Sequence, residues 1–266
     1  MSGGKDRSAR TATFVVIGVL LAMVLWGIFR EPKRPESRRM AEMEEIARSR
    51  AGLEADRRDA ELVRQLIAED LDDRRFRFGT VMRAASGKQV LPLDPESPTH
   101  RRVLDAIDAS LARATGILSR EDSPVREHRR INEVSSHFEE ALRLDLDAID
   151  GLACDIPANR EGDKQRSGYP DLRIVDEASG EVFYLDPKLV ENDSWDSSFR
   201  TFYFEPKDES LKINDDAVHL LVGIGHDGRS RAWTFGPWKV VDLSTTTLRL
   251  KPEFQASNRD LYPAEP

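Results

Sequence analysis

The stretch Tyr169–Leu189, YPDLRIVDEASGEVFYLDPKL, decides how the second half of this 266-residue chain folds. It holds two strings of β-forming residues joined by Glu177–Gly180, a four-residue connection that ends in glycine. Such a connection predicts an antiparallel hairpin. The register that this turn sets places Asp171 directly across from Asp186 on one face, with Cβ atoms about 5 Å apart. Lys188, two residues beyond Asp186, points to the same face.

Two carboxylates that face each other across a hairpin repel and need a compensating charge. Lys188 supplies one positive charge, and a divalent cation supplies two. Oxygen ligands of this kind suit Mg²⁺ or Mn²⁺, which take one or two carboxylates and complete their shell with water and substrate phosphate. A metal-activated water that attacks phosphorus, with the lysine assisting, is the chemistry that this set predicts. The alternative is a hairpin whose charged ends have no function, because Asp-x-Lys and Pro-Asp each occur often by chance.

Pro-Asp at 170–171 followed by Asp-Pro-Lys at 186–188 resembles the signature of the PD-(D/E)xK nuclease superfamily, which has the restriction-endonuclease-like fold. The resemblance implies a core of helix, three strands, helix and strand with a central mixed sheet. It also implies that Asp171 and Asp186 hold Mg²⁺ and that Lys188 assists the attacking water. These three residues are therefore the predicted catalytic and metal-binding set.

Members of this superfamily often add a glutamate from the core helix that precedes the hairpin, and the matching segment here is INEVSSHFEEALRLDL. Its apolar face comprises Ile131, Val134, Phe138, Ala141 and Leu142. Glu133, His137 and Glu140 recur at spacings of four and three and share another face. Glu133, which we rank first as a catalytic and metal-binding residue, or Glu140 then joins the metal site. The alternative for each is a solvated helix face.

The order of segments predicts an α+β protein: a restriction-endonuclease-like mixed sheet flanked by helices, preceded by an N-terminal transmembrane helix and a helical stalk. The predicted segments are a basic tail over 1–10, a transmembrane helix over 11–29, a linker and helical stalk over 30–75, a helical or mixed connecting region over 76–122, and the nuclease-like domain over 123–266. Pro187 departs from the family pattern, where a strand hydrophobe is more usual, since proline belongs at a sheet edge or bulge.

Proline and glycine mark the expected elements of the globular part. Helices are expected from Ser97-Pro98 to about Leu118 and from Ser123-Pro124 to about Ile149. Two short strands are expected within 75–93, and the helical stalk should run over 37–73. Beyond the hairpin, strands are expected over 199–206, 217–225, 231–235 and 238–243.

The segment Thr11–Phe29 is apolar and carries no charge over 19 residues, which as a helix roughly matches the ~30 Å hydrocarbon core of a bilayer. It predicts a single uncleaved membrane anchor; the competing interpretation is a secretory signal. Both flanks are basic, and the C-terminal flank slightly more so. The chain is therefore expected in the inner or cell membrane with its C-terminal domain in the cytoplasm.

Charge argues against nucleic acid as a partner. The chain has a net charge of −8, and residues 151–266 carry 14 basic and 21 acidic side chains. A DNA contact would need a local basic surface on an acidic domain. Cys154 is the only cysteine, so no intrachain disulfide forms.

Taken together, the residues and the resemblance predict a membrane-anchored, Mg²⁺-dependent (or Mn²⁺-dependent) endonuclease that hydrolyses DNA phosphodiester bonds, with a homodimer expected for double-strand cutting. The alternative is a non-catalytic membrane-anchored α+β domain that binds a protein or envelope partner. The acidic head and the long stalk favour this alternative.

Overall fold

A computed structural model describes residues 36–69, 71, 73–198, 201–251 and 253 of the chain. The chain divides into two compact units, Met1–Glu69 and Asp70–Pro266. The first contains the helix α2 (Glu36–Ala68), whose described side chains are almost all exposed. This confirms the helix predicted over 37–73, which ends five residues early.

Among the described residues, we find no helix with the length and apolar character needed to cross a membrane. The predicted span over 11–29 and the predicted tail over 1–10 both lie outside the described residues.

The second unit contains helices, strands and single-turn 3₁₀ helices in one chain order. They are β1 (Arg75–Arg77), α3 (Phe78–Ser86), β2 (Val90–Leu91), α4 (Pro98–Leu118), η1 (Pro124–Glu127), α5 (Ile131–Asp147), β3 (Leu152–Asp155), β4 (Leu172–Asp176), β5 (Val182–Glu191), η2 (Asn192–Ser194), β6 (Ala217–His226), β7 (Phe235–Asp242), η3 (Leu243–Thr245) and β8 (Thr247–Arg249). The region predicted as a connection, 76–122, thus supplies β2 and α4 to the same unit.

Six strands form one mixed sheet in the order β2-β6-β5-β4-β3, and β7 pairs with β6 beside β2. β5 and β6 are parallel, as are β2 and β6, whereas the β3–β4, β4–β5 and β6–β7 pairs are antiparallel. β1 and β8 pair separately as a two-stranded antiparallel ribbon. The mixed sheet flanked by helices confirms the predicted fold class at this level.

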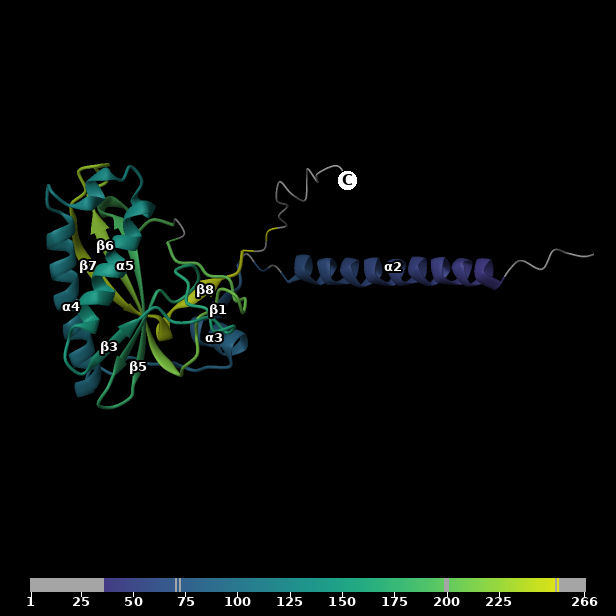
Figure 1. The fold of residues 1–266 in the computed structure, drawn as a ribbon, viewed down its shortest axis with the longest axis horizontal. Coiled ribbons are helices and arrows are strands. Elements are labelled where there is room, and N and C mark those ends of the chain that lie inside the picture. Colours follow the sequence, from purple (N-terminus) through teal and green to yellow (C-terminus); the bar gives the residue numbers. More distant parts are fainter. Residues whose placement is uncertain (1–35, 70, 72, 199–200, 252, 254–266) are drawn as a thin grey trace, which may run out of the picture. The chain divides into compact units, whose positions relative to one another are not determined.

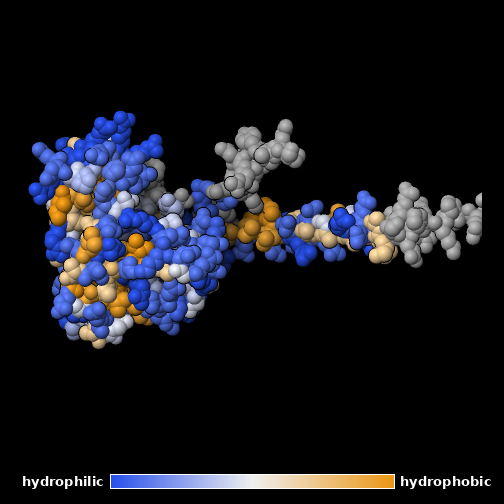
Figure 2. Space-filling view, in the orientation of Figure 1, coloured by the Kyte–Doolittle hydropathy of each residue, from blue (hydrophilic) through white to orange (hydrophobic). Residues whose placement is uncertain are grey.

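Two apolar layers cover the sheet. Side chains of α4 and α5 pack against Ile174, Phe183, Leu185 and Val222 on one face. On the other face, α3 and the segment 202–213 pack around Tyr184. Figure 1 shows α4 and α5 lying along the strands, with α3, β1 and β8 grouped on the other side of this unit. In Figure 2 its visible surface is mainly hydrophilic, with small apolar patches.

Four expected elements differ from the structure. The strand expected over 231–235 does not form, because residues 231–234 are irregular and β7 begins only at Phe235. Residues 201–206 form no strand; Phe202 and Phe204 instead pack as half-buried side chains against the α3 layer. The helix expected from Ser123-Pro124 begins as η1, and the α-helix starts only at Ile131. Between β5 and β6 the described residues hold η2 but no α-helix, so the second core helix implied by the resemblance is not found there.

Candidate active site

The β4–β5 hairpin has the register that the turn predicts. Leu172 pairs with Leu185 and Val175 with Val182. Gly180 adopts φ 74°, a left-handed conformation that suits glycine and closes the four-residue turn. Continuing the ladder by one residue brings Asp171 opposite Asp186.

Lys188 joins the two carboxylates. Its Nζ atom lies 2.5 Å from Asp186 Oδ2 and 3.1 Å from Asp171 Oδ2. The Asp186 side chain is 3 % exposed, that of Asp171 12 % and that of Lys188 26 %. The structure therefore brings the three predicted residues together in a nearly buried cluster, which we call the DDK cluster; their catalytic roles stay a prediction.

The DDK cluster holds two carboxylates but only one ammonium group. Burial, reinforced by the neighbouring Asp171 carboxylate, raises the pKa of Asp186 to about 8. Burial alone lowers the pKa of Lys188, but the carboxylates of Asp186 and Asp171 outweigh it and raise this pKa overall. Asp186 Oδ2 is buried and receives no well-directed hydrogen bond, although the ammonium is close. A buried oxygen of this kind is a ready ligand for a cation.

The DDK cluster lies where the two hairpin strands separate. β4 begins at Leu172, opposite Leu185, so from Asp186 onward β5 pairs only with β6. Pro187 sits in this single-sided stretch, opposite Val222 of β6. A proline is tolerated where a strand has a free side, which accounts for the departure from the family pattern.

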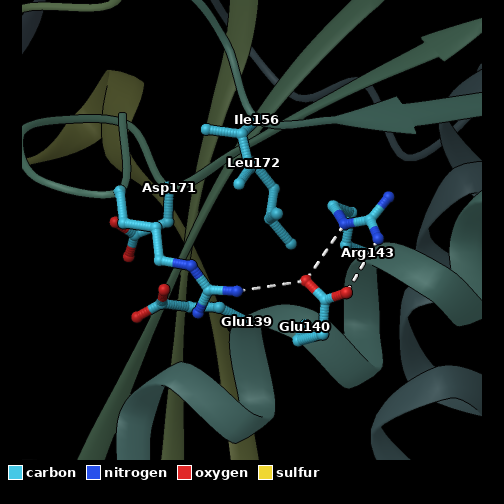
Figure 3. Close-up of a pocket in the computed structure, with 7 residues that line it drawn as sticks. Glu139, Glu140, Arg143, Ile156, Asp171 and Leu172 are labelled. Carbon is cyan, nitrogen blue, oxygen red and sulfur yellow. Dashed lines mark hydrogen bonds and ion pairs between the residues drawn. The ribbon is translucent and has the colours of Figure 1, made fainter. Parts of the chain in front are cut away.

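The helix α5 brings a glutamate that sequence reasoning missed. Glu139 and Asp171 line one small cavity, and burial, with a contribution from the Asp171 carboxylate, raises the pKa of Glu139. Figure 3 shows the carboxylate of Glu139 directed toward the side of the cavity where Asp171 lies. The only sequence signal was the Glu-Glu pair at 139–140, beside the buried Phe138.

Glu140, one of the two predicted helix glutamates, lines the same cavity but points elsewhere. It accepts hydrogen bonds from Arg143 at 2.8 and 3.2 Å, and Arg166 lies 3.3 Å away. Figure 3 shows the contacts with Arg143 as dashed lines on the side away from Asp171. Its negative charge is therefore balanced by two arginines.

Glu133, the glutamate ranked first, is not brought to the DDK cluster. It lies in the first turn of α5, where its carboxylate accepts the backbone N–H groups of Arg129 and Arg130 at 3.2 Å. This is a capping interaction at the helix N-terminus. The spacing of four and three correctly placed Glu133 and Glu140 on one face of the helix. The hairpin, however, lies against the neighbouring flank of α5, which carries Glu139.

A second lysine was also missed. Lys212 is fully buried, and its Nζ donates to the Gln165 carbonyl at 3.0 Å. Burial lowers its pKa, against the opposing effect of the Asp171 and Glu139 carboxylates. No periodic pattern in the sequence singles out this residue, because it lies in the irregular segment before β6.

The donor set fits a hard divalent ion. Within the described part of the chain, no three His, Cys, Asp or Glu side chains are grouped closely enough to hold a metal by themselves. Mg²⁺ does not require three, because it is usually held by one or two carboxylates, with water and substrate phosphate in the remaining positions. Asp171 and Asp186 provide that pair.

The chain belongs to the Type II restriction enzyme MjaV family, to which residues 71–265 match. A curated relative is the Type II restriction enzyme MjaV of Methanocaldococcus jannaschii, which is 29% identical over 198 residues. The aligned part covers 70% of this chain and 84% of that enzyme.

These findings correct the predicted location in the inner or cell membrane. The membership of a family of type II restriction enzymes opposes it.

Proposed function

We propose that this chain is an endonuclease of the PD-(D/E)xK type that hydrolyses phosphodiester bonds of DNA with Mg²⁺ or Mn²⁺. The observation that carries the proposal is the convergence of Asp171, Asp186 and Lys188 in the buried DDK cluster. Membership of a restriction-enzyme family supports DNA as the substrate class. The chain order α5, β3, β4, β5, β6 supports the superfamily assignment.

Each residue has a role in this proposal. The ion, when bound, supplies Lewis-acid activation and neutralises phosphate charge. Asp171 and Asp186 are its oxygen ligands, and Glu139 approaches from α5 as a further acceptor. Lys188 stays protonated near neutral pH, because the carboxylates raise its pKa. Its ammonium therefore donates to a phosphate oxygen and stabilises the negative charge that develops during attack.

The first test is plasmid cleavage by the full-length protein in Mg²⁺, Mn²⁺ or EDTA. We expect cutting with either ion, none in EDTA, and a loss of about a hundredfold or more in Asp186→Ala and Lys188→Ala. Asp105→Asn, on the exposed side of α4, is the matched control and should cut normally. Mg²⁺ should also raise the melting temperature of the wild type but not of Asp186→Ala.

Intact plasmid under all metals, with no metal-dependent shift in melting temperature, would favour the alternative of a non-catalytic binding domain. A homodimer stays a prediction of this proposal, since cutting both strands of a duplex calls for two sites. Light scattering of the protein with and without duplex DNA measures it directly.

A further inference from the structure

The β1–β8 ribbon carries an unusual arrangement of charge. Its register pairs Arg75 with Arg249, Phe76 with Leu248 and Arg77 with Thr247. Side chains alternate between the two faces of a strand. The three arginines therefore share one face, and Phe76 and Leu248 share the other.

The two faces of the ribbon have different surroundings. Arg75, Arg77 and Arg249 are exposed, whereas Phe76 and Leu248 are half-buried. Leu248 packs against the same apolar layer as Phe78 of α3. The ribbon is therefore fixed to the domain by its apolar face and presents its arginine face to solvent.

Arg75 directly opposite Arg249 is an unfavourable pair. Like charges at facing positions of an antiparallel pair destabilise it, because their Cβ atoms are about 5 Å apart. Within the described residues, neither these two side chains nor Arg77 makes an ion pair or hydrogen bond. Other arginines of the unit do find carboxylates: Arg113 pairs with Asp145, and Arg173 with Asp215. The ribbon thus concentrates three guanidinium groups without a counter-charge in the described structure.

The ribbon lies on the face of the sheet that carries the DDK cluster. The layer that holds Leu248 also contains Tyr184, and Tyr184 lies two residues before Asp186 on β5. Residues two apart in a strand project from the same face. Figure 1 shows β1 and β8 beside α3 and away from α4, which covers the opposite face.

We infer that the arginine face of the β1–β8 ribbon binds backbone phosphates of the DNA duplex that enters the site. This inference rests on the proposed function and adds the surface that holds the substrate. Duplex DNA carries one negative charge per about 1.7 Å of its axis, so it supplies several phosphates to so short a ribbon. Guanidinium groups match phosphate with paired hydrogen bonds. The ribbon is the local basic surface that an otherwise acidic domain needs to bind DNA.

The test measures the affinity of the full-length protein for a fluorescent duplex of mixed sequence in EDTA, between 50 and 200 mM NaCl. Each phosphate contact contributes about 0.9 to the slope of log K against log salt. Replacing Arg75, Arg77 and Arg249 together by Gln should reduce that slope by about 2 to 3 and weaken binding at low salt. The matched control replaces Arg101, Arg113 and Arg120 of the α4 region by Gln, which removes the same charge from the opposite face and should leave the slope nearly unchanged.

A second readout separates binding from folding. Without DNA, the ribbon variant should melt at the same temperature as the wild type or higher, because the opposed charges are relieved. The inference is overturned if the wild type fails to bind the duplex, if both triple variants lose the same slope, or if the ribbon variant loses stability with its slope intact. Cleavage is measured separately. If DNA binding depends on the ribbon but no metal-dependent cutting occurs, the proposed nuclease function is rejected and DNA binding by the ribbon stands. If the protein cuts DNA but binding does not depend on the ribbon, only the inference about the ribbon is rejected.

Discussion

Glu139 and Glu140 are neighbours in the sequence, yet their carboxylates have different partners. Glu139 lies near the Asp171 carboxylate, whereas Glu140 is paired with Arg143 and Arg166. Burial raises the pKa of Glu139, whereas the hydrogen bond from Arg143 lowers the pKa of Glu140. A carboxylate that is buried beside another carboxylate gains from a cation nearby. One that is already paired with arginines gains little, so we expect only Glu139 to take part in the metal chemistry.

Replacing Glu139 by Gln should therefore reduce Mg²⁺-dependent cleavage by about ten- to a hundredfold, the usual effect of losing a group that supports a metal site. The same change at Glu140 is the matched control, because it alters the adjacent residue by the same atoms. Initial rates on plasmid over a range of Mg²⁺ concentrations measure both. Equal losses in the two variants would contradict the assignment.

Among the elements, the hairpin carries the site, and its turn sets the register. Gly180 adopts a positive φ, and a Cβ there meets no neighbouring atom, so the cost of a side chain is backbone strain alone. Asp176 supports the same turn by accepting the Ser179 N–H at 2.9 Å. A register slip of one residue would turn Asp186 and Lys188 to the opposite face of the sheet.

Gly180→Ala should lower the free energy of unfolding by about 1 kcal/mol, because an alanine is strained in the left-handed region. Gly116→Ala is the control of opposite sign: Gly116 lies inside α4 with open space around it, and the change should stabilise by about 0.5 to 1 kcal/mol. Urea unfolding of both variants gives the two values. If Gly180→Ala proves stabilising, the turn does not hold the register as described.

The sequence predicts the hairpin well because a turn of known length fixes which residues face each other. It does not predict Glu139 as the helix glutamate near the hairpin, and the reason is also physical. Helical periodicity identifies the buried stripe Val134, Phe138 and Leu142 but not which flank of that stripe faces the hairpin. The string at 199–206 predicted a strand because it is rich in aromatic, β-forming residues. In residues 201–206, however, Phe202 and Phe204 pack on the α3 layer without a neighbouring strand.

For the whole molecule, the family match and the compact second unit cover almost the same residues, 71–265 and 70–266. A chain that begins at residue 70 should therefore fold and keep metal-dependent cleavage within about threefold of the full-length protein, if that protein cuts as proposed. Circular dichroism, thermal melting and plasmid cleavage measure this. A shortened chain that melts normally but cuts far more slowly would show that the first 69 residues contribute to activity.

The position of Lys188 affects how the metal ion and the DNA influence each other's binding. Its ammonium already offsets part of the charge of the two aspartates, so a lone divalent ion meets a site of reduced negative charge. A phosphate that arrives with the ion gives the ammonium a new partner and frees the aspartates for coordination. Ion and DNA should then favour each other's entry, and linkage requires the effect to be mutual. Calorimetric titration of Ca²⁺ with and without duplex would register this coupling as tighter binding of the ion when the duplex is present.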